Sequence, residues 1–149
     1  MKPSSEQVKV QPPLLAIFFI ALAFVFGLLK PLPITVSPAL RWVGLGLAAL
    51  GFLLGLAALM AFRQARQRSA RPVLVTTGVY GLSRNPIALG FVLMLAGLPL
   101  NADSLWGIVL SPALIILFNL LVIQPEERFL TRHSGKEYEV YKNRVRRWL

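Results

Sequence analysis

Two short polar motifs at the edges of apolar runs carry the side chains that could do chemistry in this chain. The first lies within residues 78–90 and contains Arg84-Asn85-Pro86 in a row. The second is Glu126-Glu127, just after the last long apolar run. Charged groups beside a membrane segment are costly unless they are paired or bind a ligand. Both motifs are therefore candidate binding elements.

The chemistry of the first motif suits an anion. The guanidinium of Arg84 can clamp a carboxylate or phosphate, although an arginine at this position can also extend its charged end to lipid headgroups. Tyr80 can stack on a flat ring or belong to the aromatic belt of a membrane protein. A helix that begins at Pro86 adds partial positive charge. The motif thus predicts a site for a ligand with an anionic group.

The second motif has two interpretations. Glu126 and Glu127 follow Pro125 and so occupy the first turn of a predicted helix, where the helix dipole favours negative charge. They can simply cap that helix. Alternatively, one carboxylate pairs with a cation, either Arg84 or a ligand ammonium, and paired carboxylates also bind Mg²⁺ or transfer protons. These residues predict a pocket beside lipid and leave the reaction open.

Composition indicates a membrane protein. The chain has 149 residues, of which 56% are hydrophobic and only 15% are charged, whereas a soluble domain has about 25% charged residues. It has no cysteine and one histidine, which excludes a catalytic thiol and metal sites built from thiolates or several histidines. We attribute the net charge of +10 to topology and to anionic lipid headgroups, not to nucleic-acid binding.

Four apolar runs supply the elements that must position the two motifs. They span residues 14–29, 43–62, 86–100 and 105–123. A membrane helix needs about 20 apolar residues, and flanking residues can extend the shorter runs. We therefore predict an all-α fold, an integral membrane helical bundle with four transmembrane helices in a single multi-pass domain.

The polar C-terminal part, residues 126–149, is predicted to be helical. Ser134-Gly135 indicates a break, and a stripe recurs after it at helical spacing: Tyr138, Tyr141, Val145 and Trp148. An aromatic stripe with basic neighbours is typical of a helix that lies on a membrane surface. We therefore expect a C-terminal interfacial helix.

The distribution of positive charge predicts the orientation of the chain. Of the 16 Lys and Arg residues, all but Lys30 and Arg41 fall in residues 1–13, 63–85 and 126–149. Cytosolic segments of membrane proteins carry an excess of Lys and Arg. We therefore expect both termini and both polar motifs on the cytosolic side.

Small residues in the second apolar run predict close helix packing. Gly51-x-x-x-Gly55 lets another helix approach the backbone closely. One interpretation is packing within a single bundle. The other is a homodimer through Gly51 and Gly55.

Taken together, the motifs resemble a known family. In chain order they are Gly78-x-Tyr80, Arg84-Asn85-Pro86, Gly90, Glu126-Glu127-Arg128, Gly135-Lys136-Glu137-Tyr138-x-x-Tyr141 and Val145-x-Arg147. This set resembles the isoprenylcysteine carboxyl methyltransferase and phospholipid methyltransferase families of small integral membrane enzymes. The resemblance covers about residues 71–149. It departs at Ala88, where the family often has a tyrosine.

The resemblance implies a methyltransferase that uses S-adenosylmethionine, needs no metal, and acts on a lipophilic substrate at the cytosolic membrane face. The acceptor would be a prenylcysteine-like carboxylate or a phospholipid amine. Glu127 and Arg128 would be catalytic, and Tyr138 and Tyr141 would meet the substrate. The cofactor would be bound by Tyr80, Arg84, Asn85, Pro86, Gly90, Glu126 and Glu127.

Two alternative functions remain at this point. A small structural or assembly protein of the membrane with a degenerate site would explain Ala88. A nicotinamide-dependent membrane reductase is the other alternative, because integral sterol reductases have a related C-terminal architecture.

Overall fold

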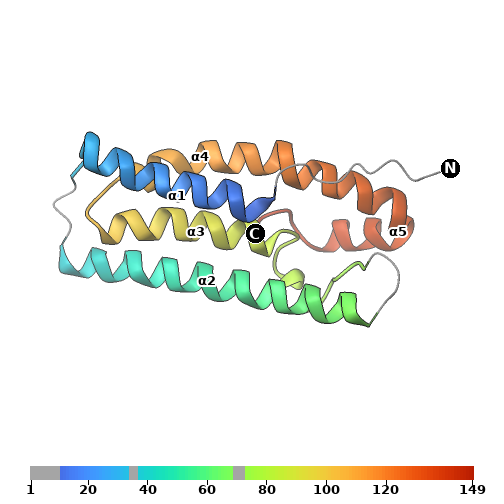
Figure 1. Ribbon diagram of the computed structural model, residues 1–149. Coiled ribbons are helices and arrows are strands. Elements are labelled where there is room, and N and C mark those ends of the chain that lie inside the picture. Colours follow the sequence, from blue (N-terminus) through green and yellow to red (C-terminus); the bar gives the residue numbers. More distant parts are fainter. Residues whose placement is uncertain (1–10, 34–36, 69–72) are drawn as a thin grey trace.

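The chain folds into a bundle of helices (Figure 1). The structure is a computed structural model and describes residues 11–33, 37–68 and 73–149. The predicted cytosolic N-terminus, residues 1–10, and Arg71 lie outside these ranges. The elements are α1 (Pro12–Leu29), α2 (Pro38–Gln67), the 3₁₀ turn η1 (Gly78–Gly81), α3 (Pro86–Asn101), α4 (Trp106–Phe118), the π-helical turn η2 (Asn119–Ile123) and α5 (Gln124–Arg144).

The predicted all-α class is confirmed for the described residues. They form helices, turns and irregular segments, with one isolated bridge between Pro33 and Ser104. Helices α1, α2, α3 and α5 each have a proline in the first turn. Proline suits this position because the backbone there needs no donor and the ring presets a helical φ.

Three helices are long and apolar enough to cross a membrane. They are α1, α2 and the continuous helix that runs from Trp106 to Arg144. In the last of these the continuous apolar run ends at Ile123, and residues 124–144 are mostly polar. The three long helices and the exposed apolar surface described below show a multi-pass membrane protein.

The remaining predicted span, α3, is apolar but shorter. It has 16 residues, which corresponds to about 24 Å of helix, whereas a bilayer core is about 30 Å thick. The prediction of four full spans is therefore supported for three helices by length, and α3 is a shorter apolar helix.

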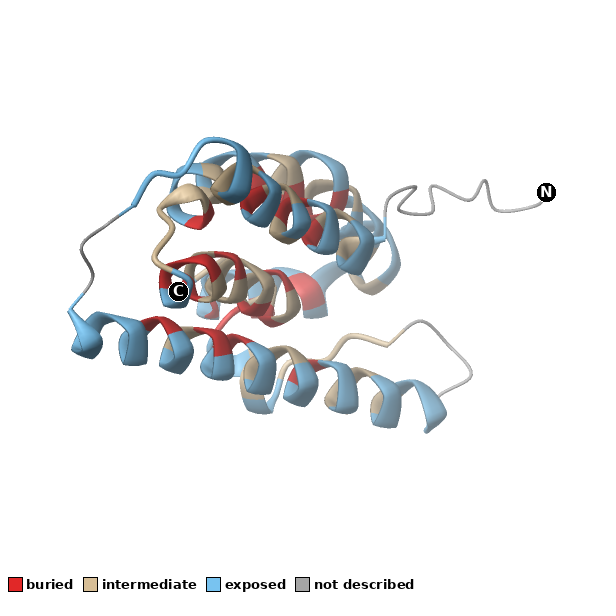
Figure 2. Cartoon of the chain, turned by 60° about the vertical axis from the view of Figure 1, so that its left-hand side comes forward, coloured by how far each residue is buried: buried red, intermediate tan, exposed pale blue. Residues whose placement is uncertain are grey.

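Helix α3 lies in the middle of the bundle. It contacts α2 on one side and α1 and α4 on the other (Figure 2). Its buried side chains include Ala88 and Leu95, which join a core with Ala16, Phe19 and Phe118. The outer helices instead expose large apolar residues such as Phe18 and Leu53, each about 60% accessible. This outer surface is suited to lipid.

Glycine pairs allow α2 and α3 to approach closely. A Cβ atom added at Gly51 would overlap the carbonyl oxygen of Gly90, and one added at Gly97 would overlap that of Gly44. Gly51 is therefore used for packing inside the chain, as the first interpretation of Gly51-x-x-x-Gly55 expected. The homodimer through Gly51 and Gly55 stays a prediction.

The C-terminal helix bends where the break was predicted, but it does not present its aromatic stripe to a membrane surface. Gly135 has a φ of 44°, which interrupts α5. Beyond it, Tyr138, Tyr141 and Val145 are buried and pack on other parts of the chain, including Leu74. The prediction of a stripe facing lipid was wrong, because an apolar stripe at helical spacing suits a protein surface equally well.

Gly51→Ala and Gly46→Ala form a matched pair in α2. A methyl group at Gly46 would meet no atom within 4 Å, whereas one at Gly51 would overlap Gly90. Alanine favours a helix over glycine by roughly 0.8–1 kcal/mol, while forced overpacking costs about 1–3 kcal/mol. We expect Gly51→Ala to lower the melting temperature in detergent and Gly46→Ala to keep or raise it. Equal melting temperatures would contradict the close α2–α3 contact.

Candidate functional site

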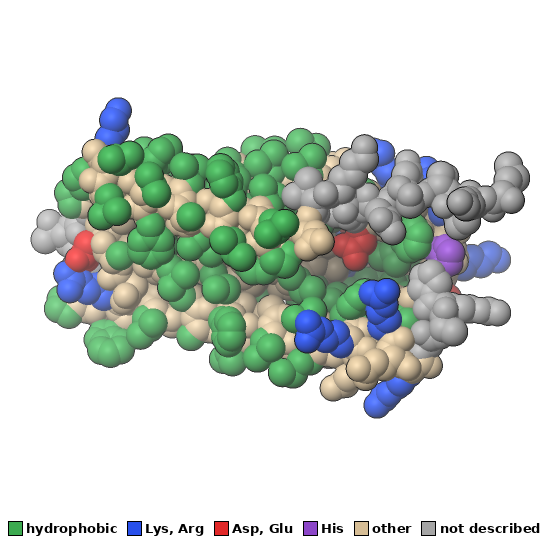
Figure 3. Space-filling view, viewed as in Figure 1, with side chains coloured by type: hydrophobic (Ala, Val, Ile, Leu, Met, Phe, Trp, Pro, Cys, Tyr) green, Lys and Arg blue, Asp and Glu red, His purple; other side chains and the backbone are tan. Residues whose placement is uncertain are grey.

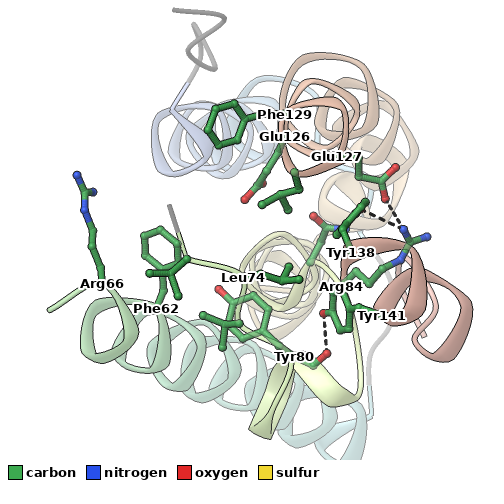
Figure 4. A pocket seen from close by; sticks show the side chains of 14 residues that line it. Phe62, Arg66, Leu74, Tyr80, Arg84, Glu126, Glu127, Phe129, Tyr138 and Tyr141 are labelled. Carbon is green, nitrogen blue, oxygen red and sulfur yellow. Dashed lines mark hydrogen bonds and ion pairs between the residues drawn. The ribbon is translucent and has the colours of Figure 1, made fainter. Parts of the chain in front are cut away.

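A cavity of about 510 Å³ lies among the end of α2, the segment that leads to α3, and α5 (Figure 4). It occupies the end of the molecule where several Lys and Arg side chains gather, next to the apolar surface (Figure 3). Its lining combines apolar, aromatic and charged side chains: Phe62, Arg66, Val73, Leu74, Val75, Tyr80, Arg84, Asn85, Glu126, Glu127, Phe129, Leu130, Tyr138 and Tyr141.

One carboxylate joins the two polar motifs. Glu127 Oε1 lies 2.9 Å from Arg84 Nη1, and Glu127 also accepts two hydrogen bonds from Arg147, from Nε at 3.1 Å and from Nη2 at 2.6 Å. The side chains of Arg84 and Glu127 are only 9% and 14% exposed. A carboxylate held between two guanidinium groups in a partly buried place is strongly oriented. Its hydrogen bond also raises the pKa of Arg147, which stays charged.

Three tyrosines connect this ion-pair cluster to the wall of the cavity. Arg84 Nη1 donates to the hydroxyl of Tyr138 at 3.3 Å. Tyr141 donates its hydroxyl to the carbonyl oxygen of Tyr80 at 2.7 Å. Burial is the largest cause that raises the pKa of Tyr141, to about 12, so this hydroxyl keeps its proton at neutral pH. Tyr80 is thereby held with its ring toward the cavity (Figure 4).

The last residues of the chain hold the first motif in place through hydrogen bonds to their backbone carbonyl oxygens. The backbone N–H of Arg84 donates to the carbonyl oxygen of Arg146 at 3.0 Å. The carbonyl oxygen of Arg147 accepts bonds from the Asn85 side chain at 3.2 Å and from the hydroxyl of Ser83 at 3.3 Å. Ser83 is almost fully buried. This contact fixes the backbone that carries Arg84 and Asn85.

Sequence reasoning assigned Arg147 only to the attraction between basic residues and lipid headgroups, and it gave no role to Ser83. Arg147 did belong to the motif Val145-x-Arg147, and this was the only signal for it. Its partners lie 20 residues away at Glu127 and 62 residues away at Asn85. A separation of this size carries no local pattern, so only the folded chain reveals the contact.

Glu126, the carboxylate next to Glu127 in the sequence, has a different environment. Among the described residues, none forms an ion pair or hydrogen bond with Glu126, whose side chain opens into the cavity. Glu126 is accessible to solvent at the cavity, yet the protein atoms around it desolvate the carboxylate, and this desolvation, followed by the charge of Glu127, raises its pKa above the ordinary value. A carboxylate of this kind is available to a ligand cation.

The cavity also has donors without protein acceptors in the described part of the chain. Arg84 Nε is buried and has no hydrogen-bond partner there. Arg66, on the opposite wall (Figure 4), forms no ion pair with a described residue. A buried donor without an acceptor is costly. The cavity therefore offers a negative group at Glu126 and a positive group at Arg66 to one bound molecule, while the charge of Arg84 in its wall is paired with Glu127.

The structure brings together most of the predicted site residues. Two lie elsewhere: Arg128 is exposed and lines no cavity, and Gly90 packs on Gly51. Successive helical residues point in different directions, so Arg128 cannot share the orientation of Glu127. Pro86 lines a smaller adjoining hollow. The residues that line the main cavity are Tyr80, Arg84, Asn85, Glu126, Glu127, Tyr138 and Tyr141.

Glu127 pairs with Arg84, as one interpretation of the second motif expected. With Arg84 and Arg147 as partners, its carboxylate is oriented and in turn positions Arg84. The catalytic and cofactor-binding roles expected for Glu127 stay predictions.

A family model described as "Phospholipid methyltransferase" matches residues 39–137. This range includes α2, α3, α4 and both polar motifs, and it ends just before Tyr138. Arg146 and Arg147, whose carbonyl oxygens accept hydrogen bonds from the first motif, therefore lie outside the matched range. No significant match was found among curated proteins or solved structures.

Arg147→Ala tests the support of Glu127. A hydrogen bond to a charged group contributes roughly 1.5–3 kcal/mol when buried, and because Arg147 is 37% exposed, we expect a loss of about 1 kcal/mol of stability. Arg147→Lys should restore only part of it, since lysine lacks the planar fork. Arg146→Ala is the control, because Arg146 contributes through its backbone. Equal unfolding curves for Arg147→Ala and Arg146→Ala in detergent would refute the role.

Proposed function

The chain belongs to the phospholipid methyltransferase family, and on this premise we propose that it transfers the methyl group of S-adenosylmethionine to a lipophilic acceptor at the cytosolic membrane face. The observation that carries the proposal is the main cavity. It places the carboxylate of Glu126 and the guanidinium of Arg66, neither in an ion pair with a described residue, around one space beside membrane helices.

The lining residues fit S-adenosylmethionine. Its ammonium group suits Glu126, which has no cation partner among the described residues. Its carboxylate suits Arg66 or Arg84, which both line the cavity. Its adenine ring suits the aromatic side chains of Phe62, Tyr80 and Phe129. The cavity volume of about 510 Å³ lies within the roughly 300–1,000 Å³ common for small-molecule sites.

The chain itself supplies alignment and an environment with little water. When bound, S-adenosylmethionine supplies a methyl group that is already activated on a sulfonium. Most of the remaining barrier is then a matter of orientation and desolvation. Glu127 and Arg147 hold Arg84, and Tyr141 holds the backbone of Tyr80. These contacts support a preorganised binding site rather than a proton-transfer site.

The distribution of charge supports the cytosolic face. The end of α2 carries Arg63 and Arg66, and the C-terminal segment carries further basic residues at the same end of the molecule as the cavity (Figure 3). Excess positive charge favours the cytosolic side of a membrane. The opposite end carries Lys30 and an Arg41–Asp103 ion pair.

Binding of S-adenosylmethionine to the detergent-solubilised protein tests the proposal by calorimetry. Arg84→Ala and Glu126→Gln should each weaken binding about 10- to 100-fold, because a hydrogen bond to a charged group contributes roughly 1.5–3 kcal/mol. Arg63→Ala is the control, since Arg63 is exposed on α2 and does not line the cavity. No binding by the unsubstituted protein would reject the proposal, and thermal stabilisation by NADPH alone would favour the reductase.

The pH dependence of binding tests the role of Glu126 separately. Burial and the charge of Glu127 raise the pKa of Glu126 above 4.5. As pH falls through this raised pKa, the carboxylate gains a proton and loses its attraction for an ammonium group. We therefore expect the affinity for S-adenosylmethionine to fall with decreasing pH, with a midpoint above 4.5. Glu126→Gln should remove this step, and an unchanged pH profile in that variant would assign the step to another group.

A further inference from the structure

Helix α5 ends at Arg144, and the chain continues as a non-helical tail, residues 145–149. The backbone of Val145 is extended, with φ −118° and ψ 130°, so the tail leaves the direction of the helix. Trp148 therefore does not share the orientation of the buried tyrosines of α5. The tail returns to the bundle beside the segment that precedes α3 (Figure 1).

Trp148 lies at the level where the membrane helices begin. It is partly exposed and packs against the core cluster of the bundle, which contains Ala88 of α3 and Val122 of η2. Its neighbour Arg147 is bonded to Asn85, the residue before α3, so this contact is at the cavity end of the bundle. A tryptophan has a large apolar ring and one N–H donor, and it favours the boundary between lipid headgroups and acyl chains. Trp148 therefore has the chemistry and the location of an interfacial anchor.

The neighbours of Trp148 suit the two sides of such a boundary. Leu149 is apolar and yet 73% exposed, while Arg146 is exposed and charged. The turn η2, at the same end of the bundle, also exposes an apolar side chain, Leu120, by 53%. Contact of apolar surface with water is unfavourable in proportion to its area. Leu149 thus fits acyl chains, and Arg146 can extend its charged end to headgroups.

The backbone of the tail can lie beside lipid because its carbonyl oxygens have donors. A carbonyl without a donor is costly where water is scarce. The carbonyl oxygen of Arg146 accepts the backbone N–H of Arg84 at 3.0 Å. That of Arg147 accepts bonds from the side chains of Ser83 at 3.3 Å and Asn85 at 3.2 Å. The first motif and the tail therefore satisfy each other at the edge of the membrane.

We propose that Trp148 and Leu149 anchor the tail in the lipid leaflet next to the main cavity, and that the anchored tail holds the first motif in place. The tail is joined to the site by its bonds to residues 83–85 and by Arg147, which pairs with Glu127. Lipid at one end of the tail is thereby coupled to the cavity wall. The contact with lipid is independent of the proposed function, whereas its effect on S-adenosylmethionine binding rests on that function.

Quenching of tryptophan fluorescence tests the contact with lipid. The chain has three tryptophans, so Trp42→Phe with Trp106→Phe leaves Trp148 as the emitter. The control is Val140→Trp in a chain whose three tryptophans are replaced by phenylalanine. Val140 is 67% exposed, close to the 73% of Leu149, but it lies on the polar helix α5. In vesicles of phosphatidylcholine brominated near the headgroup, we expect Trp148 to be quenched at least about twofold more than the control. Equal quenching, or stronger quenching of Trp148 by iodide in water, would overturn the anchor.

A spin label gives a second measurement with the three tryptophans intact. The chain has no cysteine, so Leu149→Cys and Val140→Cys can each be labelled at one site. At Leu149 we expect more collisions with oxygen, which is enriched in lipid, than with a water-soluble nickel chelate, and at Val140 the reverse. The same order of collisions at both sites would contradict the contact of the tail with lipid.

Trp148→Ala tests the coupling of the tail to the site. Amide hydrogen exchange of residues 82–85 should become at least about threefold faster, because loss of an anchor lowers the cost of local opening. Residues 101–105, at the other end of α3, should keep their exchange rates. Trp148→Phe retains an apolar ring and should restore most of the protection. Unchanged exchange of residues 82–85, or an equal rise at both ends, would refute the coupling.

S-adenosylmethionine binding in lipid nanodiscs separates this coupling from the proposed function. Trp148→Ala should weaken binding about 5- to 20-fold and Trp148→Phe less than about twofold. Trp148 lines neither the main cavity nor the smaller hollow, so a lost contact with the ligand does not explain such a change. Full affinity of Trp148→Ala would overturn the effect on binding. Absence of binding by the unsubstituted protein would instead reject the proposed function, and the fluorescence and exchange measurements would still decide the anchor and its coupling.

Discussion

The arrangement of the candidate site depends on one carboxylate between two guanidinium groups. Glu127 pairs with Arg84 from the segment before α3 and with Arg147 from the end of the chain. Two cations around a partly buried anion compensate part of its desolvation, whereas loss of one partner leaves buried charge without compensation. Three segments far apart in sequence are thereby joined at one point. Tyr80 and Glu126 line the same cavity and lie to one side of the Glu127–Arg84 pair (Figure 4).

The position of α3 explains how such a polar cluster can adjoin a membrane bundle. This helix is too short to cross a bilayer by itself, and close contacts at Gly90 and Gly97 hold it against α2. Its first turn therefore begins at the level where the apolar outer surface meets the basic end of the molecule (Figure 3). Arg84 and Asn85, immediately before that turn, are placed beside lipid without being surrounded by it. A water-soluble cofactor and a lipid-borne acceptor can meet only at such a boundary.

The two adjoining spaces differ in their linings. The larger one has charged groups at Glu126 and Arg66 without an ion-pair partner among the described residues, so it suits a ligand that carries both charges. The smaller one is mainly apolar and is lined by Pro12 and by the first turn of α3. Glu126 lines both spaces, so its charge affects what binds in each.

Much of the fold could be predicted from local properties of the chain. The lengths of the apolar runs predicted α1, α2 and α4, and Gly135 predicted the bend in α5. The polar residues at the ends of these runs identified most of the cavity lining, because unpaired charge beside lipid indicates a ligand. The family match over residues 39–137 agrees with the resemblance carried by those residues.

Other features were decided only by tertiary structure. A stripe such as Tyr138 and Tyr141 has the same periodicity whether it faces lipid or protein, so its burial depends on how the bend at Gly135 returns the helix to the bundle. The pairing of Glu127 with Arg147 joins residues 20 positions apart without any local pattern. The sequence by itself determined which groups lie near the membrane boundary. The folded chain decided which of them are paired and which remain for a ligand, because charge compensation depends on distances in space.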